Sequence, residues 1–389
     1  MASRWHTITL GGIAPLLALS ACHQIFPYEA GRAAPDGGAG PVTVSSRGAL
    51  VSAHAVAAVG GGYVVAWVER GESDQQLHLA DYAKTGERGA EQQLPFSSGS
   101  VERFALVGNG EAGLALLYTV SEDHDLHGYL LSRGAAGWIL VKWYSAVVKS
   151  YGTSFFSTPT GFGAAYEDFK PVNGVTARVV MLARFDSDGV AAGDPVAAAP
   201  DLSVQYSPSA AMDSDNVYHV VWHNASFQAT YLRFNPMEPA TPPPAPLGGA
   251  HASNVRIAAA GDHVIIGWSE DAVVWHRLVD RYGKAAWSDR TLIPRSRHLW
   301  PEWGMAGGTG GIQLAWTTDA LSVLPQILQA RVDPASGEPK EPLEGELISD
   351  KAYSFCCAKV AVTPGGGSAV AFLGTIPGSR ALLLHVVPE

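Results

Sequence analysis

The sequence predicts an all-β fold, a seven-bladed β-propeller of four-stranded blades, and three observations support this prediction. A short apolar segment that ends in an aromatic residue recurs seven times, at intervals of 46 to 56 residues. Turn-forming Gly, Asn and Asp residues separate these segments from other short runs of alternating residues. No segment shows a helical period. A repeat of roughly 40–50 residues built from short strands is typical of propellers.

Each recurring segment is expected to be the second strand of a blade. A first strand precedes it across a turn such as 60–62 or 213–216, where Gly and Asn adopt positive φ at little cost. A third strand follows, and a polar fourth strand closes the blade. The aromatic residues that end the seven segments are Trp67, Tyr118, Tyr166, Trp222, Trp268, Trp316 and Phe372.

The two ends of the chain predict how the ring closes. The last repeat has strands near 358–363, 368–373 and 380–387 and no fourth strand, whereas 41–45 forms an extra strand before the first repeat. We expect this N-terminal strand to complete the last blade, because closure removes an exposed sheet edge. Residues 41–389 would then form a single propeller domain. Six or eight blades are the alternatives, since the repeat around 101–150 is irregular.

The first forty residues predict export and an anchor. Arg4 and His6 precede an apolar stretch at 8–19, too short for a stable membrane span and typical of a secretory signal. The next residues, Leu-Ser-Ala-Cys22, resemble the lipobox of bacterial lipoproteins. That resemblance implies a signal peptide at 1–21 and acylation of Cys22, palmitate included, with 22–40 as the acylated cysteine and a flexible tether.

His23 follows the cysteine, where an aspartate often signals retention at the inner membrane. The resemblance therefore implies a lipid-anchored protein of the outer membrane, on its periplasmic side or at the cell surface. The alternative is an ordinary cleaved signal with a chance cysteine.

The composition limits the partners. A formal charge of −10 argues against nucleic acid or an anionic lipid surface. We expect a monomer without a cofactor that contacts the outer membrane through its lipid and binds an envelope protein or glycan.

Two further cysteines, Cys356 and Cys357, are adjacent. In an oxidising compartment they form a vicinal disulfide or remain thiols.

The loops after the aromatic segments and the loops before the first strands open on one face of a propeller. This face contains acids such as Glu69, Glu167, Asp168 and Glu270. Such a face suits a cationic partner, a carbohydrate or a divalent ion, and the alternative is a set of solvated loops. The residues we expect to bind a ligand there are Arg47, Arg103, Glu122, Asp123, Tyr206, Asn254, Trp300 and Glu302.

Several patterns favour turns or buried side chains over chemistry. Residue types that bind metals occur in the loop at 121–127, but a solvated loop is the favoured interpretation. They also occur in the pair His219 and His223, for which two half-buried histidines are favoured. No metal site is therefore predicted. The segment 108–113 matches G-x-G-x-x-G between two strands and predicts a hairpin. No nucleophile, P-loop or zinc motif is present, so no catalytic residue is predicted.

One segment resembles a known family. Val279-Asp280-Arg281-Tyr282-Gly283-Lys284-Ala285-Ala286-Trp287 is similar to the turn of quinoprotein-type propellers, a family that includes an outer-membrane assembly lipoprotein. In some propellers of this kind a vicinal disulfide lies against the cofactor, so the resemblance implies a ligand platform at Cys356 and Cys357, and the alternative is a structural oddity or two buried thiols. The signature sequences of WD40, Kelch and sialidase repeats are missing.

These observations predict a non-enzymatic cell-envelope lipoprotein that binds a protein or carbohydrate partner on the loop face of its propeller. One alternative is an envelope carbohydrate-active enzyme, a glycoside hydrolase or lyase, with Glu122, Glu167, Asp168 or Glu270 as acid and base. Another is a scaffold for outer-membrane protein assembly, which rests on fold and anchor alone.

Overall fold

The computed structural model describes most of the chain from Gly40 to Pro388. The described residues are 40–45, 50–70, 74–96, 101–109, 113–120, 126–134, 137–146, 151–172, 174–199, 205–235, 243–249, 252–260, 263–270, 273–280, 282–284, 290–293, 303–308, 311–318, 326–333, 336, 338, 346–349, 358–376 and 379–388. No helix long and apolar enough to cross a membrane occurs in these ranges.

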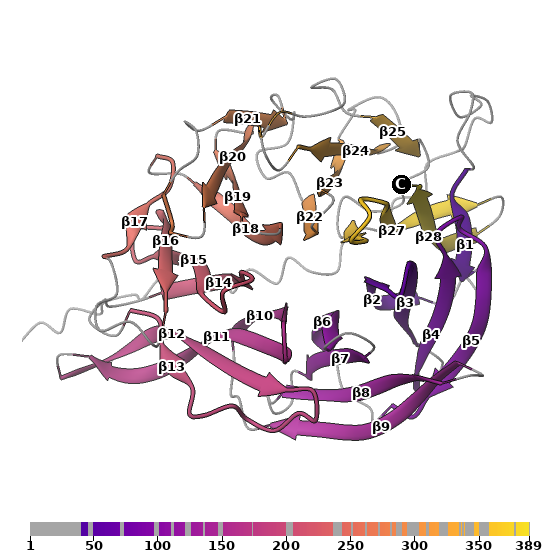
Figure 1. Ribbon diagram of the computed structural model, residues 1–389, viewed down its shortest axis with the longest axis horizontal. Coiled ribbons are helices and arrows are strands. Elements are labelled where there is room, and N and C mark those ends of the chain that lie inside the picture. The colour runs from indigo at the N-terminus through magenta and orange to yellow at the C-terminus, as the bar shows by residue number, and fades with distance from the viewer. Residues whose placement is uncertain are drawn as a thin grey trace, which may run out of the picture.

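The described strands form seven four-stranded antiparallel sheets arranged in a ring, so the predicted seven-bladed propeller is confirmed (Figure 1). Blade 1 contains β2 (Leu50–Val59), β3 (Gly62–Arg70), β4 (Gln75–Ala83) and β5 (Arg88–Leu94). Blade 2 contains β6 (Val101–Asn109), β7 (Gly113–Val120), β8 (Leu126–Gly134) and β9 (Gly137–Ala146). Blade 3 contains β10 (Tyr151–Thr158), β11 (Gly161–Val172), β12 (Val175–Asp186) and β13 (Val196–Ala197).

The remaining four blades repeat this order. Blade 4 contains β14 (Gln205–Met212), β15 (Tyr218–Asn224), β16 (Ala229–Phe234) and β17 (Ala245–Pro246). Blade 5 contains β18 (Ser253–Ala260), β19 (His263–Glu270), β20 (Val273–Asp280) and β21 (Arg290–Ile293). Blade 6 contains β22 (Trp303–Gly308), β23 (Gly311–Thr318), β24 (Gln326–Val332) and β25 (Glu346–Ser349). Blade 7 contains β26 (Lys359–Val362), β27 (Ser368–Ile376), β28 (Ser379–Val387) and β1 (Val42–Ser45).

The ring closes through its first strand, as the sequence predicts. β1 pairs antiparallel with β28, with Val42 opposite Leu384, and so supplies the outer strand of blade 7. The inner strands, which are the first strand of each blade, pack side by side around the axis, and β26 contacts β2 to complete the circle (Figure 1). The closed ring leaves no blade incomplete.

The recurring aromatic residues fill the interfaces between blades. The described residues form seven separate hydrophobic clusters, and each joins two neighbouring blades. In each cluster the aromatic residue of one blade packs against the preceding blade, as Trp222 does against Ala165, Val180 and Leu182. Trp67 of blade 1 packs in the same way against blade 7. Burial of these large rings explains why the sequence repeats them, because each interface needs one.

Two turns match the predicted chemistry. The G-x-G-x-x-G segment joins β6 to β7, with Asn109 opposite Gly113, and is a hairpin connection. Asp186 accepts hydrogen bonds from the N–H groups of Asp188 and Val190, which is the pattern of a plain Asp-initiated turn. Blade 2, whose sequence is irregular, has the same four-stranded order as the others.

Candidate functional site

The loop face is formed where inner strands begin and where second strands end. Of the eight predicted ligand-binding residues, Arg103, Tyr206 and Asn254 lie in the described part of the chain, near the start of β6, β14 and β18 respectively. The structure places them on blades 2, 4 and 5, so blade 3 separates Arg103 from the other two. The other residues predicted to bind, to be acylated or to form a disulfide lie outside the described residues: Arg47, Glu122, Asp123, Trp300, Glu302, Cys22, Cys356 and Cys357.

Bulges shape the start of the inner strands. The pairing of β14 with β15 shifts register between Tyr206 and Ser209, and that of β18 with β19 shifts between Ser253 and Arg256. Inside these bulges Ser207 has φ of 49° and Asn254 has φ of 47°, which are left-handed values uncommon for residues with a side chain. A bulge leaves a residue unpaired in the ladder, so the Ser207 N–H is available to another partner.

That partner is Glu167, on the neighbouring blade 3. The Ser207 N–H donates to Glu167 Oε1 at 2.7 Å, and Arg178 Nη1 donates to Glu167 Oε2 at 3.0 Å. Glu167 is 3% exposed, so both carboxylate oxygens are used inside the protein. Burial raises the pKa of Glu167, while the Ser207 N–H and the charges of Arg178 and Arg103 act in the opposite direction.

Arg178 belongs to a stack of side chains that reaches the surface. Its guanidinium lies 5.0 Å from the ring centre of Tyr206 and 5.4 Å from that of Phe169. On the other side of Tyr206, the ring of Phe227 is nearly parallel, at 5.8 Å and 6°. We call Phe227, Tyr206, Arg178 and Phe169 the aromatic–arginine stack.

The two ends of the stack are open to solvent. Phe227 is 67% exposed and Phe169 is 50% exposed, which is unusual for rings of this size. The salt bridge to Glu167 holds Arg178 in the middle. The result is an aromatic surface across blades 3 and 4, held by the ion pair of the partly exposed Arg178 with the buried Glu167.

Three further acids of the loop face also have partners within the protein. Glu69 is 6% exposed and accepts hydrogen bonds from the Ser45 hydroxyl at 2.5 Å and the Trp67 indole at 2.8 Å. Glu270 accepts from the N–H of Gly249, and Asp168 pairs with Lys170 at 2.8 Å. Over the described residues, Glu69, Glu167 and Glu270 of the expected acidic rim therefore join structural elements, whereas Asp168 pairs within its own strand and Asp74 is exposed.

His223 borders the stack on the side of blade 5. It pairs with Tyr206 across β14 and β15. Burial lowers the pKa of His223, the charge of Arg256 lowers it further, and a hydrogen bond with the backbone of Ala252 acts against both. The buried Nε2 atom of His223 has no hydrogen-bond partner among the described residues. It is a polar atom next to the stack with capacity for a further bond.

His219 serves a different purpose from His223. It is fully buried, with Nδ1 at 2.7 Å from the Tyr231 hydroxyl and Nε2 at 3.0 Å from Asp213 Oδ2. Each ring nitrogen thus has a protein partner inside blade 4. Over the described ranges no group of three His, Cys, Asp or Glu residues could hold a metal.

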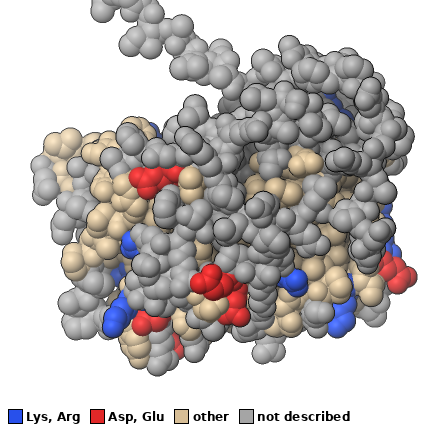
Figure 2. Space-filling model, turned by 90° about the horizontal axis from the view of Figure 1, so that it is seen from above, with Lys and Arg blue, Asp and Glu red and all other residues tan. Residues whose placement is uncertain are grey.

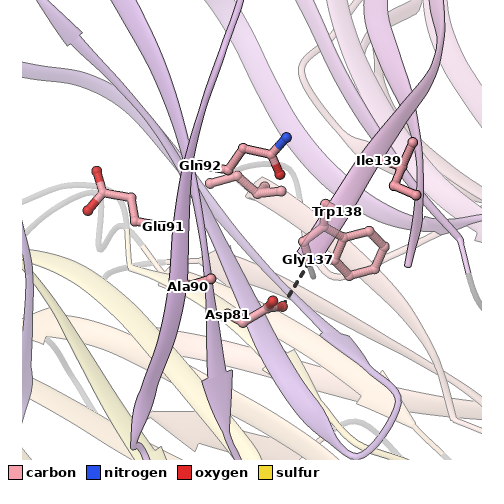
Figure 3. A pocket seen from close by; sticks show the side chains of 8 residues that line it. Asp81, Ala90, Glu91, Gln92, Gly137, Trp138 and Ile139 are labelled. Atoms are coloured by element: carbon pink, nitrogen blue, oxygen red, sulfur yellow. Dashed lines mark hydrogen bonds between the residues drawn. The ribbon is translucent and has the colours of Figure 1, made fainter. Parts of the chain in front are cut away.

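A groove also lies on the outer rim, between blades 1 and 2. It encloses about 410 Å³ between β5 and β9 and is lined by Leu79, Asp81, Ala90, Glu91, Gln92, Gly137, Trp138 and Ile139. Figure 3 shows Asp81 directed at Trp138, whose indole N–H donates to Asp81 Oδ1 at 2.8 Å. Arg133 lies over the same indole ring. The polar groups on the floor of this groove are thus already paired.

Sequence reasoning did not predict three members of the stack. Arg178 and Phe169 lie on the β11–β12 hairpin, whose strands of 12 residues each are longer than the equivalent strands of the other blades. Phe227 lies in the turn after β15 with φ of 58°. One signal in the repeat could have indicated the site. A polar residue directly follows the aromatic residue that ends the segment in three repeats, namely Glu167, His223 and Ser269.

Comparisons with known proteins identify the fold. No protein-family profile and no curated protein sequence matches the chain. Among solved structures, the polysaccharide lyase Uly1 is similar with a TM-score of 0.52 at 11% identity, over 96% of this chain and 94% of that one. The periplasmic gluconolactonase PpgL of Pseudomonas aeruginosa gives 0.51 at 13% identity, over 82% and 93%.

The β-propeller domain of the Trilobed protease from Pyrococcus furiosus gives a TM-score of 0.51 at 9% identity, over 87% of this chain and 95% of that one. At such low identities these likenesses concern the fold and not the activity. Together with the seven closed sheets, they establish that this chain forms a seven-bladed β-propeller.

Proposed function

We propose that this protein is a lipid-anchored envelope protein that binds a carbohydrate on the loop face of its propeller, at the aromatic–arginine stack. The observation that carries the proposal is the stack itself. It presents two exposed aromatic rings, Phe227 and Phe169, on a base held by the ion pair of Arg178 with the buried Glu167.

The chemistry of the stack suits a sugar. An aromatic face binds the apolar C–H face of a pyranose ring, and nearby polar groups bind its hydroxyls. Arg178, whose side chain is 33% exposed, supplies such a group 5.0 Å from the ring centre of Tyr206. Because the stack is already ordered without a ligand, binding costs little side-chain entropy.

Two observations support the anchor. The sequence Leu-Ser-Ala-Cys22 follows a short apolar stretch. In addition, Val42 at the start of β1 lies next to Gly86 in the turn between β4 and β5, since a Cβ atom at Gly86 would be 3.7 Å from Val42 Cγ2. This turn lies on the face opposite the stack, since successive antiparallel strands alternate in direction. A tether before β1 would leave from that opposite face, and the stack would point away from the outer membrane.

A binding experiment on the full chain tests the carbohydrate site. A panel of oligosaccharides is titrated against wild type, Tyr206→Ala, Phe227→Ala and a matched control, Tyr282→Ala. Tyr282 is as exposed as Phe227, at 67%, but lies in the β20–β21 turn on the opposite face. We expect the two stack variants to bind about tenfold more weakly or worse, and the control to bind normally.

Equal binding by all four proteins would exclude the stack as the site. A pull-down can instead recover a protein partner while no glycan binds. If Tyr206→Ala abolishes that recovery, the ligand of the stack is a protein and not a carbohydrate. The anchor is tested by growing cells that express the protein with radioactive palmitate. If the Cys22→Ser variant is labelled as strongly as wild type, acylation at Cys22 is refuted.

An enzyme that cleaves the same carbohydrate is the second candidate. Glu167 has a raised pKa and lies beside Arg178 and Tyr206, which is the kind of setting used for acid–base chemistry. However, Glu167 is buried and both its oxygens already have partners, which favours binding over turnover. Cleavage of a bound glycan that is lost in Glu167→Gln would favour the enzyme.

A further inference from the structure

The β11–β12 hairpin of blade 3 lengthens the proposed site. Its two strands have 12 residues each and are paired without interruption from Gly161 opposite Asp186 to Val172 opposite Val175. Tyr166, which ends the recurring segment, is followed by six further residues of β11, against two to four in the other blades. The hairpin therefore projects beyond the other blades on the loop face.

The projecting hairpin has one packed face and one open face. Successive residues of a strand point to opposite sides. On one side Val172 and Ala177 are buried in the cluster that blade 3 shares with blade 2. The residues that alternate with them are Phe169, Pro171, Thr176 and Arg178. All four are at least partly exposed, so the second side of the hairpin is open.

The open face of the hairpin is continuous with the aromatic–arginine stack. Phe169 lies directly opposite Arg178 on the paired strands. The Arg178 guanidinium extends from there to Tyr206 on blade 4, 5.0 Å from the ring centre, and Phe227 lies beyond Tyr206. The open face is thus turned towards blade 4, and one row of accessible side chains joins the two blades.

The spacing of this row suits an extended chain. Neighbouring groups from Phe227 to Phe169 are 5.8, 5.0 and 5.4 Å apart. Each separation is close to the length of one pyranose unit in an extended polysaccharide. The two most exposed rings, Phe227 at 67% and Phe169 at 50%, are the two ends of the row. A single sugar can cover only one of them, whereas a chain of several units covers both.

The charges beside the row are already paired. Glu167 is paired with Arg178, and Asp168 is paired with Lys170. On the side of the ring that Figure 2 shows, the described acidic and basic residues are interspersed among uncharged residues. Over the described residues, the length of the row rather than a net charge is therefore the feature that can distinguish one carbohydrate from another.

We propose that the site binds the internal units of an extended polysaccharide, with one sugar on Phe227, another on Phe169 and the hydroxyls of the units between them on Arg178. This inference rests on the proposed carbohydrate site. The Arg178 side chain is 33% exposed and carries N–H donors that suit sugar hydroxyls. Two contacts made by one chain reinforce each other, because the second forms within a complex that already exists, and a chain too short to span the row loses this gain.

A length series tests the proposal. Chitin, cellulose and mannuronate oligomers of defined size, from the monosaccharide to the octasaccharide, are titrated calorimetrically against the full chain. In at least one series we expect the affinity to rise by about 100-fold between the disaccharide and the hexasaccharide, with little further gain in the octasaccharide. Hexasaccharides blocked at either end should bind as tightly as the free hexasaccharide, because only internal units are needed.

Substitutions assign the length dependence to the two ends of the row. Phe169→Ala and Phe227→Ala are each expected to lower the affinity for the hexasaccharide to nearly that for the disaccharide, and to affect the disaccharide far less, since one ring remains. Val175→Ala is the matched control. Val175 is 68% exposed at the tip of the same hairpin, but on the same side of β12 as the buried Ala177. Circular dichroism spectra identical to wild type show that the variants fold.

The outcomes separate the two proposals. Equal affinities along the length series, all lost in Tyr206→Ala, would overturn the extended chain and leave the carbohydrate site in place. A length dependence that is unchanged in both phenylalanine variants would also overturn it, as would loss of binding when one end of the hexasaccharide is blocked. Absence of binding in every series would overturn both proposals.

Discussion

The backbone N–H of Ser207 and the carboxylate of Glu167, 2.7 Å apart, join blades 3 and 4 directly beneath the aromatic–arginine stack. Burial raises the pKa of Glu167 above its usual value of 4.5, even though the Ser207 N–H and Arg178 act against the rise. The folded protein therefore binds a proton at Glu167 more tightly than the unfolded chain does. This contribution to stability is complete below pH 4.5 and is lost as the pH rises through the raised pKa.

The first prediction follows from this linkage. Glutamine at position 167 does not ionise, so Glu167→Gln should gain stability relative to wild type as the pH rises above 4.5. Urea unfolding of both proteins at pH 4 and pH 8 measures the difference. Glu87→Gln, at an exposed position, is the control. A difference that is constant or that falls with pH would contradict the prediction.

The second prediction concerns the interfaces between blades. Trp222 is completely buried against blade 3, and its removal leaves a large cavity. Trp222→Ala should lower the free energy of unfolding by about 3–5 kcal/mol. Phe227→Ala, five residues away at the exposed end of the stack, should change it by less than about 0.5 kcal/mol. Similar losses for the two variants would show that the interface does not depend on the indole.

The third prediction concerns the hydrogen bonds of His219. The Tyr231 hydroxyl lies 2.7 Å from His219 Nδ1 in the interior of blade 4. Tyr231→Phe leaves that nitrogen buried without a partner and should cost about 1–3 kcal/mol of stability. Tyr282→Phe removes an exposed hydroxyl and should cost nothing measurable. Equal melting temperatures for the wild type and Tyr231→Phe would rule out this role.

The fourth prediction concerns Asp213 and acid. Desolvation acts to raise the pKa of Asp213, but hydrogen bonds from His219 and from the N–H groups of Val217 and Asp215 outweigh it, and the pKa falls below 3.8. A lowered pKa stabilises the folded state above pH 3.8, and this stability is lost as the pH falls through the lowered value. The advantage of wild type over Asp213→Asn should therefore shrink on acidification. A gap that widens in acid would refute it.

The fifth prediction concerns the strand that closes the ring. Val44 of β1 is 1% exposed and packs in the cluster between blades 7 and 1. Val44→Asp buries a charge without a partner and should destabilise the protein by more than about 3 kcal/mol. Thr43→Asp, on the other side of the same strand, is the control. Equal resistance of the two variants to limited proteolysis would show that β1 is dispensable.

The sequence predicted the ring because the fold depends on a pattern that repeats. Trp67, Trp222 and Phe372 each fill one interface, so their spacing is a direct record of the blades. The role of β1 was predictable for the same reason, since the last repeat lacks a strand and the first has one to spare.

The site was less predictable because it depends on contacts between repeats. Tyr206 and Arg103 were identified from their place at the start of inner strands, but Phe227 and Arg178 come from a turn and from an elongated hairpin. The sequence also does not reveal whether a loop acid is exposed. The sequence pattern predicts that Glu69 and Glu167 lie in surface loops. In the structure each is buried by the neighbouring blade.

The pairing of β1 with β28 has a consequence for the order of folding. Val42 is paired with Leu384, so the two ends of the domain must meet before the circle is complete. Contacts this distant in sequence form slowly, because a very long loop must close before they are gained. Blades 1 to 6 have all four strands from consecutive segments and can assemble as the chain emerges. Blade 7 has to wait for the last residues, so ring closure follows the assembly of the other blades.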